Sequence, residues 1–175
     1  MGRAKGLLLS REGLPLIERT GRLFEVLGIP WVLVGVREEY AYLGRPALVD
    51  DPPFVGPLGG LRSLLHYVAD GLAIAVACDM PYVSGALVER LIAATPGAPI
   101  VAPRRRDRWE PLFARFDARA VLPIADARST RGQFSLQGLL DEARAERLPL
   151  TPDEEAMLDD WDTPLDMAIG DYPET

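Results

Sequence analysis

One aspartate stands where a short apolar run gives way to a loop. The run at residues 72–78 precedes Asp79, and Met80 and Pro81 follow it directly. Such a run predicts a buried parallel strand, and function in open α/β sheets gathers at the carboxyl ends of the strands. A carboxylate in that position can hold Mg²⁺ beside a phosphate, although many strand-end aspartates only cap a turn. This stretch leaves both roles open.

A second group of residues could approach a nucleotide. Asp51 follows the short apolar run at residues 47–49, and Gly56 and Gly59 lie between it and a helix predicted at about residues 61–69. A glycine-rich connection into a helix N-terminus suits a phosphate or a flat base. The loop has neither the GxGxxG nor the Walker pattern, so the pattern alone is weak evidence for a nucleotide site.

Two basic segments could bind an anion. Arg3 and Lys5 precede an apolar triplet near the start of the chain, where backbone N–H groups and cationic side chains could wrap a phosphate. Terminal basic residues also form plain solvated tails. The segment at residues 104–109 places four arginines beside Trp109, which suits a loop that contacts a small anion or solvent.

The single histidine and the single cysteine are not expected to be catalytic. His66 lies within a predicted helix and has no second histidine with which to form a zinc cluster. Cys78 lies at the end of the apolar run, which favours a buried thiol with no catalytic part. Near the C-terminus, Asp160 and Asp162 precede a helix start at Thr163, so they could face the strand ends or belong to a fraying acidic terminus.

The elements that must position these residues alternate along the chain. Apolar runs predict strands at residues 31–36, 47–49, 72–78, 99–102 and, more weakly, 148–150. Helical spacing and capping residues predict helices at about residues 15–28, 61–69, 85–95, 118–128 and 134–147, with a helical turn at 38–43. Alternating strands and helices predict one three-layer α/β domain over residues 1–175, with a mostly parallel sheet.

Composition limits the class of protein. The chain has 175 residues, of which 48% are hydrophobic and 26% charged, as in an ordinary globular protein. A net charge of −7 argues against a nucleic-acid partner. No apolar run approaches the ~20 residues that cross a bilayer, and the N-terminal apolar segment is too short for a secretory signal. We therefore expect a cytoplasmic protein that does not bind membranes.

Five segments, in their order and spacing, resemble those of the molybdenum cofactor guanylyltransferases, the MobA-like nucleotidyltransferases. They are MGRAKGLL at residues 1–8, GPLGG at 56–60, CDMP at 78–81, EPLF at 110–113 and DTPLD at 162–166. The resemblance extends over essentially the whole chain. It implies a Rossmann-like nucleotidyltransferase fold and the transfer of GMP from GTP to molybdopterin, with Mg²⁺ bound and pyrophosphate released.

The resemblance also implies roles for individual residues. Lys5 matches the lysine of the signature loop and would neutralise the triphosphate, with Arg3 beside it. Asp79 matches the metal-binding aspartate. Asp162 stands where the family usually has asparagine, and a carboxylate there could be a second metal ligand or could orient the acceptor. At the nucleotide, Asp51 matches the acidic position before the loop that contains Gly56 and Gly59.

Two departures from the family pattern keep alternatives open. Ala4 stands where the family usually has aspartate, and the strand and glycine-rich segment that normally precede this loop are not in the given sequence. We expect that an upstream segment is missing, because loss of a central strand would expose the apolar flanks of its neighbours. The alternatives are nucleotidyl transfer from CTP or to another phosphorylated acceptor, and a non-catalytic nucleotide-binding homologue. A homo-oligomer or contact with other cofactor-biosynthesis proteins is also compatible with the sequence.

Overall fold

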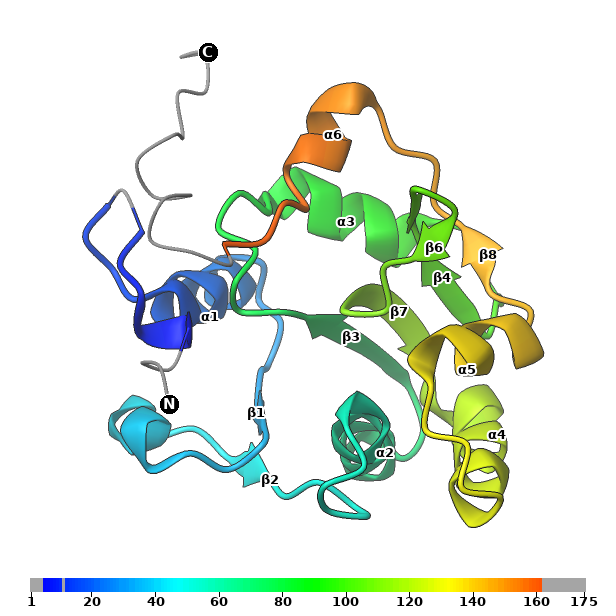
Figure 1. Cartoon of the computed structure of the whole chain (residues 1–175). Helices are drawn as coiled ribbons and strands as arrows, with labels where there is room; N and C mark the ends of the chain where they lie inside the picture. Colours follow the sequence, from blue (N-terminus) through cyan, green and yellow to red (C-terminus); the bar gives the residue numbers. More distant parts are fainter. Residues whose placement is uncertain (1–4, 11, 162–175) are drawn as a thin grey trace.

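The computed structural model describes residues 5–10 and 12–161. Its central sheet lies between two layers of helices, with α3 above it and α2, α4 and α5 below it in Figure 1. The three-layer α/β architecture expected from the sequence is confirmed. Arg3, Asp162 and the helix start predicted at Thr163 lie outside the described residues.

The helices follow the amphipathic segments of the sequence. They are η1 (Lys5–Leu7), α1 (Leu16–Val26), η2 (Glu38–Leu43), α2 (Pro57–Val68), α3 (Gly85–Ala93), α4 (Ala118–Thr130), α5 (Leu136–Glu142) and α6 (Pro152–Ala156). Four of them begin after a residue whose side chain accepts a hydrogen bond from a first-turn N–H: Ser84, Asp117, Ser135 and Thr151. Such caps satisfy backbone donors that have no partner within the helix.

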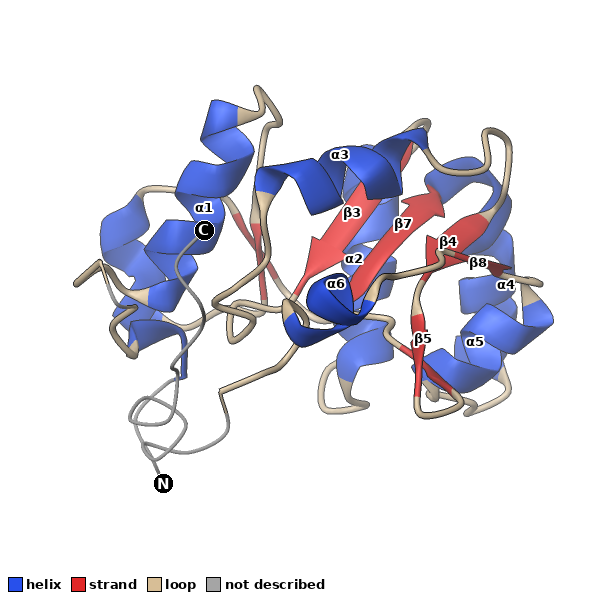
Figure 2. Ribbon diagram, turned by 90° about the horizontal axis from the view of Figure 1, so that it is seen from above, coloured by secondary structure: helices blue, strands red, loops and turns tan. Residues whose placement is uncertain are grey.

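The central sheet has the strand order β3-β7-β4-β8. The strands of the fold are β1 (Leu33–Val34), β2 (Ala47–Leu48), β3 (Leu72–Val76), β4 (Ile100–Ala102), β5 (Arg104–Arg105), β6 (Arg108–Trp109), β7 (Phe113–Asp117) and β8 (Glu146–Arg147). In the central sheet β3, β4 and β8 run in one direction, and β7 runs opposite to them between β3 and β4. The sheet is therefore mixed: three of its four strands share one direction, as expected, but β7 runs the other way and makes antiparallel pairs with β3 and β4 (Figure 2).

Two apolar clusters hold the layers together. Leu58, Leu65 and Leu139 belong to the cluster between the sheet and the layer of α2, α4 and α5. Val88 and Phe113 belong to the other cluster, between the sheet and α3, to which α1 also contributes. All five side chains are fully buried or nearly so, and burial of apolar surface is the main favourable term in folding. The sheet is thus covered on both faces, as expected for this architecture.

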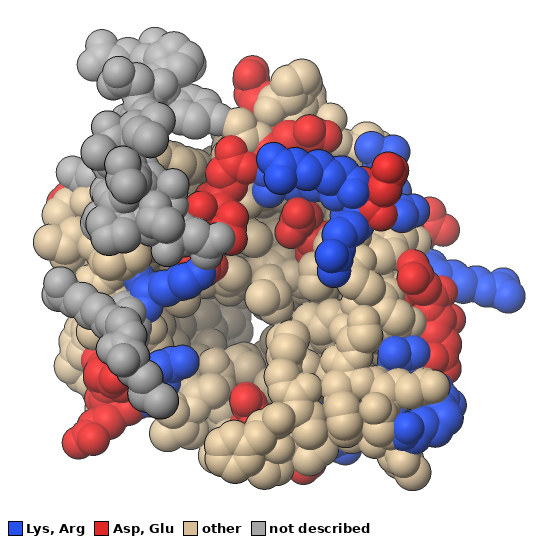
Figure 3. All heavy atoms as spheres, viewed as in Figure 1, with Lys and Arg blue, Asp and Glu red and all other residues tan. Residues whose placement is uncertain are grey.

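A separate parallel pair, β1 with β2, lies beside the central sheet. Helix α2 packs against both strands, and it approaches β1 so closely that a Cβ on Gly60 would come within 2.5 Å of Val34 Cγ1. Figure 3 shows the surface hollowed at the centre of the view, between β1 and the region of β3 and α2. None of the helices among residues 5–10 and 12–161 is both long and apolar enough to span a bilayer.

Several predicted boundaries are wrong. The predicted strand at residues 31–36 is reduced to Leu33–Val34, and β3 ends at Val76, so Cys78 lies in the turn after it. The predicted parallel pairing is not found among the described residues, since β3 is an edge strand there and pairs only with the antiparallel β7. Helix α2 begins at Pro57, four residues before its predicted start, since proline suits the first helical position.

The C-terminal elements also differ from the prediction. The helix predicted at residues 134–147 ends at Glu142, because Arg144 takes a left-handed conformation with φ of 53° that a helix cannot continue through. The chain then pairs β8 with β4, so the strand predicted at residues 148–150 is found at Glu146–Arg147. The predicted loop at residues 104–109 is instead a β-hairpin of β5 and β6.

Candidate active site

Asp79 lies in the turn after β3, beside Lys5 of η1. The Lys5 ammonium donates a hydrogen bond of 3.3 Å to Asp79 Oδ2. The Asp79 side chain is 20% exposed and that of Lys5 is 47% exposed, so both can be reached by a ligand. The Asp79 carbonyl accepts a bond of 2.9 Å from the Trp161 N–H, which ties the turn to the C-terminal segment. The structure therefore brings together two of the predicted site residues that are far apart in the sequence.

A glycine next to Lys5 permits this approach. A Cβ on Gly6 would stand 2.7 Å from Tyr40 Oη and 3.2 Å from Cys78 Sγ, so η1 packs on this turn only with glycine in place. Burial raises the pKa of the Cys78 thiol, and the neighbouring Asp79 carboxylate raises it further. A raised pKa leaves the thiol protonated near neutral pH, which supports the expectation that Cys78 is not a nucleophile.

Asp51 belongs to a second group of predicted site residues, at the start of α2. Its side chain is 67% exposed, and Oδ2 lies 3.5 Å from Arg62 Nη1. The same guanidinium donates to the Asp51 carbonyl at 2.5 Å and to Asp126 Oδ1 at 2.9 Å. Arg62 therefore links the loop, α2 and α4. Nothing in the spacing of the sequence pointed to Arg62, because its two partners lie on separate segments of the chain.

Gly56 and Gly59 shape the N-terminus of α2. Gly56 precedes the helix with φ of 80°, a conformation that side chains disfavour, and provides no capping side chain. A Cβ on Gly59 would come within 2.5 Å of the Pro52 carbonyl oxygen, so the loop crosses the helix closely. No side chain caps this N-terminus, but Pro57 has no N–H and the Gly59 N–H donates to the Gly56 carbonyl at 3.2 Å, so few first-turn donors are left for an anion.

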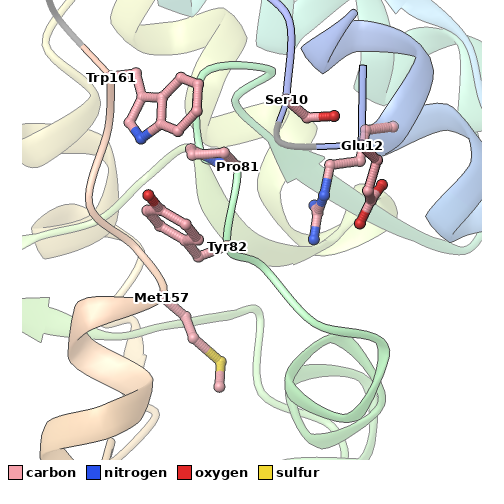
Figure 4. Close-up of a pocket in the computed structure, with 7 residues that line it drawn as sticks. Ser10, Glu12, Pro81, Tyr82, Met157 and Trp161 are labelled. Atoms are coloured by element: carbon pink, nitrogen blue, oxygen red, sulfur yellow. The ribbon is translucent and has the colours of Figure 1, made fainter. Parts of the chain in front are cut away.

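The turn formed by residues 79–82 borders two cavities. The first, of about 250 Å³, is shown in Figure 4. Trp161, Pro81 and Tyr82 line one side of it, and the rings of Tyr82 and Trp161 meet edge to face with centroids 5.9 Å apart. Ser10 lies on the other side, and its buried hydroxyl has no hydrogen-bond partner within the part of the chain that the structure describes. The sequence reasoning did not single out these aromatic residues.

The second cavity, of about 420 Å³, lies between the Asp79 turn and the β5–β6 hairpin. Its residues are Met80, Arg105, Arg106, Arg108, Trp109, Glu110, Pro111, Gln137, Leu158, Asp159 and Asp160. Burial raises the pKa of the Glu110 carboxyl, although Arg105 and Arg108 act in the opposite direction. On the face that carries β6 and α6, basic and acidic side chains are interspersed (Figure 3).

The described residues offer only part of a metal site. No group of three or more His, Cys, Asp or Glu side chains converges within residues 5–10 and 12–161. Asp79 is the predicted ligand within these ranges. A magnesium ion in proteins commonly uses one or two carboxylates and completes its shell with substrate phosphates and water. The surroundings of Asp79 fit that pattern, since the carboxylate is accessible and has the Lys5 ammonium beside it.

Comparison with known proteins places the chain in a family. A family model described as the MobA-like NTP transferase domain matches residues 1–147. A molybdenum cofactor guanylyltransferase of Xanthomonas euvesicatoria pv. vesicatoria is 34% identical over 170 residues, which cover 94% of this chain and 84% of that protein. A molybdenum cofactor guanylyltransferase of Pseudomonas putida is 36% identical over 149 residues, covering 81% of this chain and 76% of that protein.

Solved structures share the fold. Molybdopterin-guanine dinucleotide biosynthesis protein A from Archaeoglobus fulgidus superposes with a TM-score of 0.76 at 21% identity, covering 95% of this chain and 88% of that one. The 2-C-methyl-D-erythritol 4-phosphate cytidylyltransferase from Thermus thermophilus gives a TM-score of 0.64 at 15% identity, covering 94% and 90%. The match of the family model, the identity to curated relatives and the shared fold together show that the chain belongs to the MobA-like NTP transferase domain family.

Proposed function

We propose that this protein transfers GMP from GTP to molybdopterin and releases pyrophosphate. The observation that carries the proposal is the pairing of Lys5 with Asp79 at the carboxyl end of β3, in a chain of this family. A cation and a carboxylate side by side suit a metal-bound triphosphate, since the carboxylate can hold the metal and the ammonium can neutralise phosphate oxygens. The relatives named molybdenum cofactor guanylyltransferase support the choice of donor and acceptor.

In the proposed reaction a phosphate oxygen of molybdopterin attacks the α-phosphorus of GTP. The new bond joins this oxygen to the α-phosphorus, and the bond from the α-phosphorus to the oxygen that bridges to the β-phosphate breaks. The electron pair leaves with pyrophosphate. The nucleophile is already an anion, so no side chain need act as a general base. Catalysis then consists of positioning the two substrates and stabilising charge.

Individual residues have distinct parts in the proposal. Lys5 binds the triphosphate, and Arg3, in the undescribed N-terminal segment, assists it. Asp51, with Gly56 and Gly59, binds the nucleotide at the start of α2, where the positive end of the helix dipole has no side-chain cap. The residues at the start of α2 and the Lys5–Asp79 pair would then bind different parts of one GTP molecule.

Magnesium is the proposed metal, with Asp79 as a ligand and Asp162 as a second one. The ion would supply charge stabilisation at the phosphates when bound. The predicted single domain over residues 1–175, the cytoplasmic location and the possibility of a homo-oligomer stay predictions from the sequence.

The test is guanylyl transfer with radiolabelled nucleotide. Labelled GTP and labelled CTP are each incubated with molybdopterin and Mg²⁺, and transfer of the label to the pterin is measured. We expect labelled product from GTP only. Product from CTP alone would refute the guanylyl assignment, and no product from either would refute catalysis.

Asp79→Ala tests the site itself. It should reduce turnover at least 100-fold or so, as expected for loss of an essential electrostatic group, while circular dichroism and the melting temperature stay near those of the wild type. Asp70→Ala is the matched control, because it removes an exposed carboxylate elsewhere on the surface and should leave turnover unchanged. Near-normal activity of Asp79→Ala would contradict the mechanism.

A further inference from the structure

The β5–β6 hairpin has a turn that its residues do not favour. Arg106 and Asp107 form the turn with φ of 48° and 62°, both in the left-handed region. Two-residue hairpin turns with this geometry strongly prefer Asn-Gly or a similar pair, because glycine takes this conformation without strain. Arginine and aspartate at these two positions oppose the backbone preference. Where the surrounding structure holds such a strained turn in place, a functional use of its side chains is indicated.

The surrounding structure does hold this hairpin in place. Gln137 of α5 accepts a hydrogen bond of 3.0 Å from the Trp109 N–H and donates one of 2.8 Å to the Trp109 carbonyl. The Trp109 indole N–H donates to Asp141 at 2.8 Å. The Arg104 guanidinium lies over the face of the Trp109 ring, 4.9 Å from the ring centroid. These contacts fix the strand that carries Arg108 and, through the tight turn, Arg106.

The arginines of the hairpin differ in whether a carboxylate pairs with them. Arg105 donates to the Leu158 carbonyl at 2.8 Å, forms an ion pair with Asp159, and lies 3.8 Å from Glu110. Arg106 and Arg108 are exposed, and within residues 5–10 and 12–161 no carboxylate comes within ion-pair distance of either. The second cavity therefore has one guanidinium held by ion pairs, and two, those of Arg106 and Arg108, that form no ion pair among the described residues, although the charge of Arg108 also acts on Glu110.

The position of the cavity indicates which anion it suits. Met80, directly after Asp79, lines the cavity together with Arg106 and Arg108, whereas Lys5 contacts the Asp79 carboxylate itself. An in-line displacement at phosphorus requires the attacking oxygen and the leaving pyrophosphate on opposite sides of the α-phosphate. If the triphosphate binds beside Lys5, the acceptor phosphate needs its own cationic site near the same turn. Guanidinium groups suit this task because their geometry matches phosphate oxygens.

We propose that Arg106 and Arg108 bind the terminal phosphate of the pterin acceptor in the cavity between the β5–β6 hairpin and the Asp79 turn. This rests on the proposed function and adds the acceptor's binding residues to it. Glu110, Asp159 and Asp160 also face the cavity, and Arg105 is ion-paired to Asp159 and near Glu110. The strained turn then has a function, since it presents Arg106 and, two residues further on, Arg108 from a fixed hairpin.

The double variant Arg106→Ala/Arg108→Ala tests the proposal. Two measurements are made: the Kd of molybdopterin without nucleotide, followed by pterin fluorescence, and the KM values of both substrates in the transfer assay. We expect the Kd and KM of molybdopterin to rise at least about tenfold, since the loss of even one charge-assisted hydrogen bond has that effect and the variant removes two arginines. The KM of GTP should change less than about twofold, since the triphosphate contacts other residues.

Arg119→Ala/Arg147→Ala is the matched control. It removes the same charge from two exposed arginines outside the cavity, and it should leave all three constants unchanged. Inorganic phosphate, added as a competitor, should weaken molybdopterin binding to the wild type and have little effect on the Arg106→Ala/Arg108→Ala variant.

The outcomes separate this proposal from the proposed function. Unchanged Kd and KM for molybdopterin in Arg106→Ala/Arg108→Ala, with an active wild type, would overturn the acceptor site alone. A wild type that binds molybdopterin through these arginines but forms no guanylylated product would refute the proposed function and support the site. Equal loss of molybdopterin binding in both double variants would mean that only the net charge of the protein matters, and it would overturn the proposal.

Discussion

Replacing Gly59 by alanine should loosen the loop that carries Asp51. A Cβ at this position would stand 2.5 Å from the Pro52 carbonyl oxygen and 3.3 Å from Val55 Cγ2. A backbone oxygen cannot rotate away as a side chain can, so the loop must move by about 1 Å to restore ordinary contact. The loop is tied to α2 by the 3.2 Å bond from the Asp51 N–H to the Gly59 carbonyl. The movement would therefore strain that bond.

Two opposing terms set the size of the effect. Alanine in place of a helical glycine favours the folded state by about 0.5–1 kcal/mol. Overpacking of a close contact costs about 1–3 kcal/mol. The difference spans about 0–2.5 kcal/mol, and its middle value gives a fall of roughly 1 kcal/mol in the free energy of unfolding. The Kd of GTP should rise at the same time, because the displaced loop contains Asp51.

Gly85→Ala is the matched control. Gly85 also lies in the first turn of a helix, but its added Cβ would meet only Leu27 and Leu23 at 3.5 and 3.6 Å, which is ordinary contact. It should be neutral or stabilising by up to about 1 kcal/mol. Urea unfolding followed by the fluorescence of the three tryptophans gives both free energies. A Gly59→Ala protein as stable as Gly85→Ala, with an unchanged Kd for GTP, would refute the close-contact argument.

Two further predictions concern charged and titratable residues. Hydrogen bonds from Arg90 and from the Thr151 backbone lower the pKa of Glu154, so its carboxylate stabilises the fold above its ordinary pKa and this stabilisation is lost as the pH falls through the lowered value. The free energy of unfolding of the wild type should therefore exceed that of Glu154→Gln by about 0.5–1 kcal/mol near neutral pH. Urea titrations at acid pH should show this difference vanish. A difference that stays constant with pH would argue against the ion pair. The His66 side chain is half exposed, and its Nε2 lies 3.6 Å from Asp126 Oδ1. His66→Asn should therefore keep turnover within about twofold of the wild type. A much larger loss in the transfer assay would mean that His66 takes part in a reaction for which the proposed mechanism gives it no role.

Local signals in the sequence predicted most elements of the fold. Ser84 caps α3 as expected, because a hydroxyl before an amphipathic run satisfies a free N–H group. The apolar run before Asp79 forms β3, and Asp79 follows in the turn. Element ends were predicted less well. The end of α5 depends on the left-handed Arg144, and a non-glycine residue carries no sequence signal for that conformation.

The sequence by itself determined the α/β class, the covered sheet and the candidate residues, because these depend on periodicity, caps and residue chemistry over short stretches. Tertiary structure alone decided which residues meet. Lys5 and Asp79 are 74 positions apart, and Arg62 joins Asp51 to Asp126 across two elements. The antiparallel insertion of β7 and the formation of a hairpin from the arginine-rich segment, on a cavity that Met80 also lines, are likewise long-range outcomes. They depend on strand pairing and packing between distant segments, which local pattern does not encode.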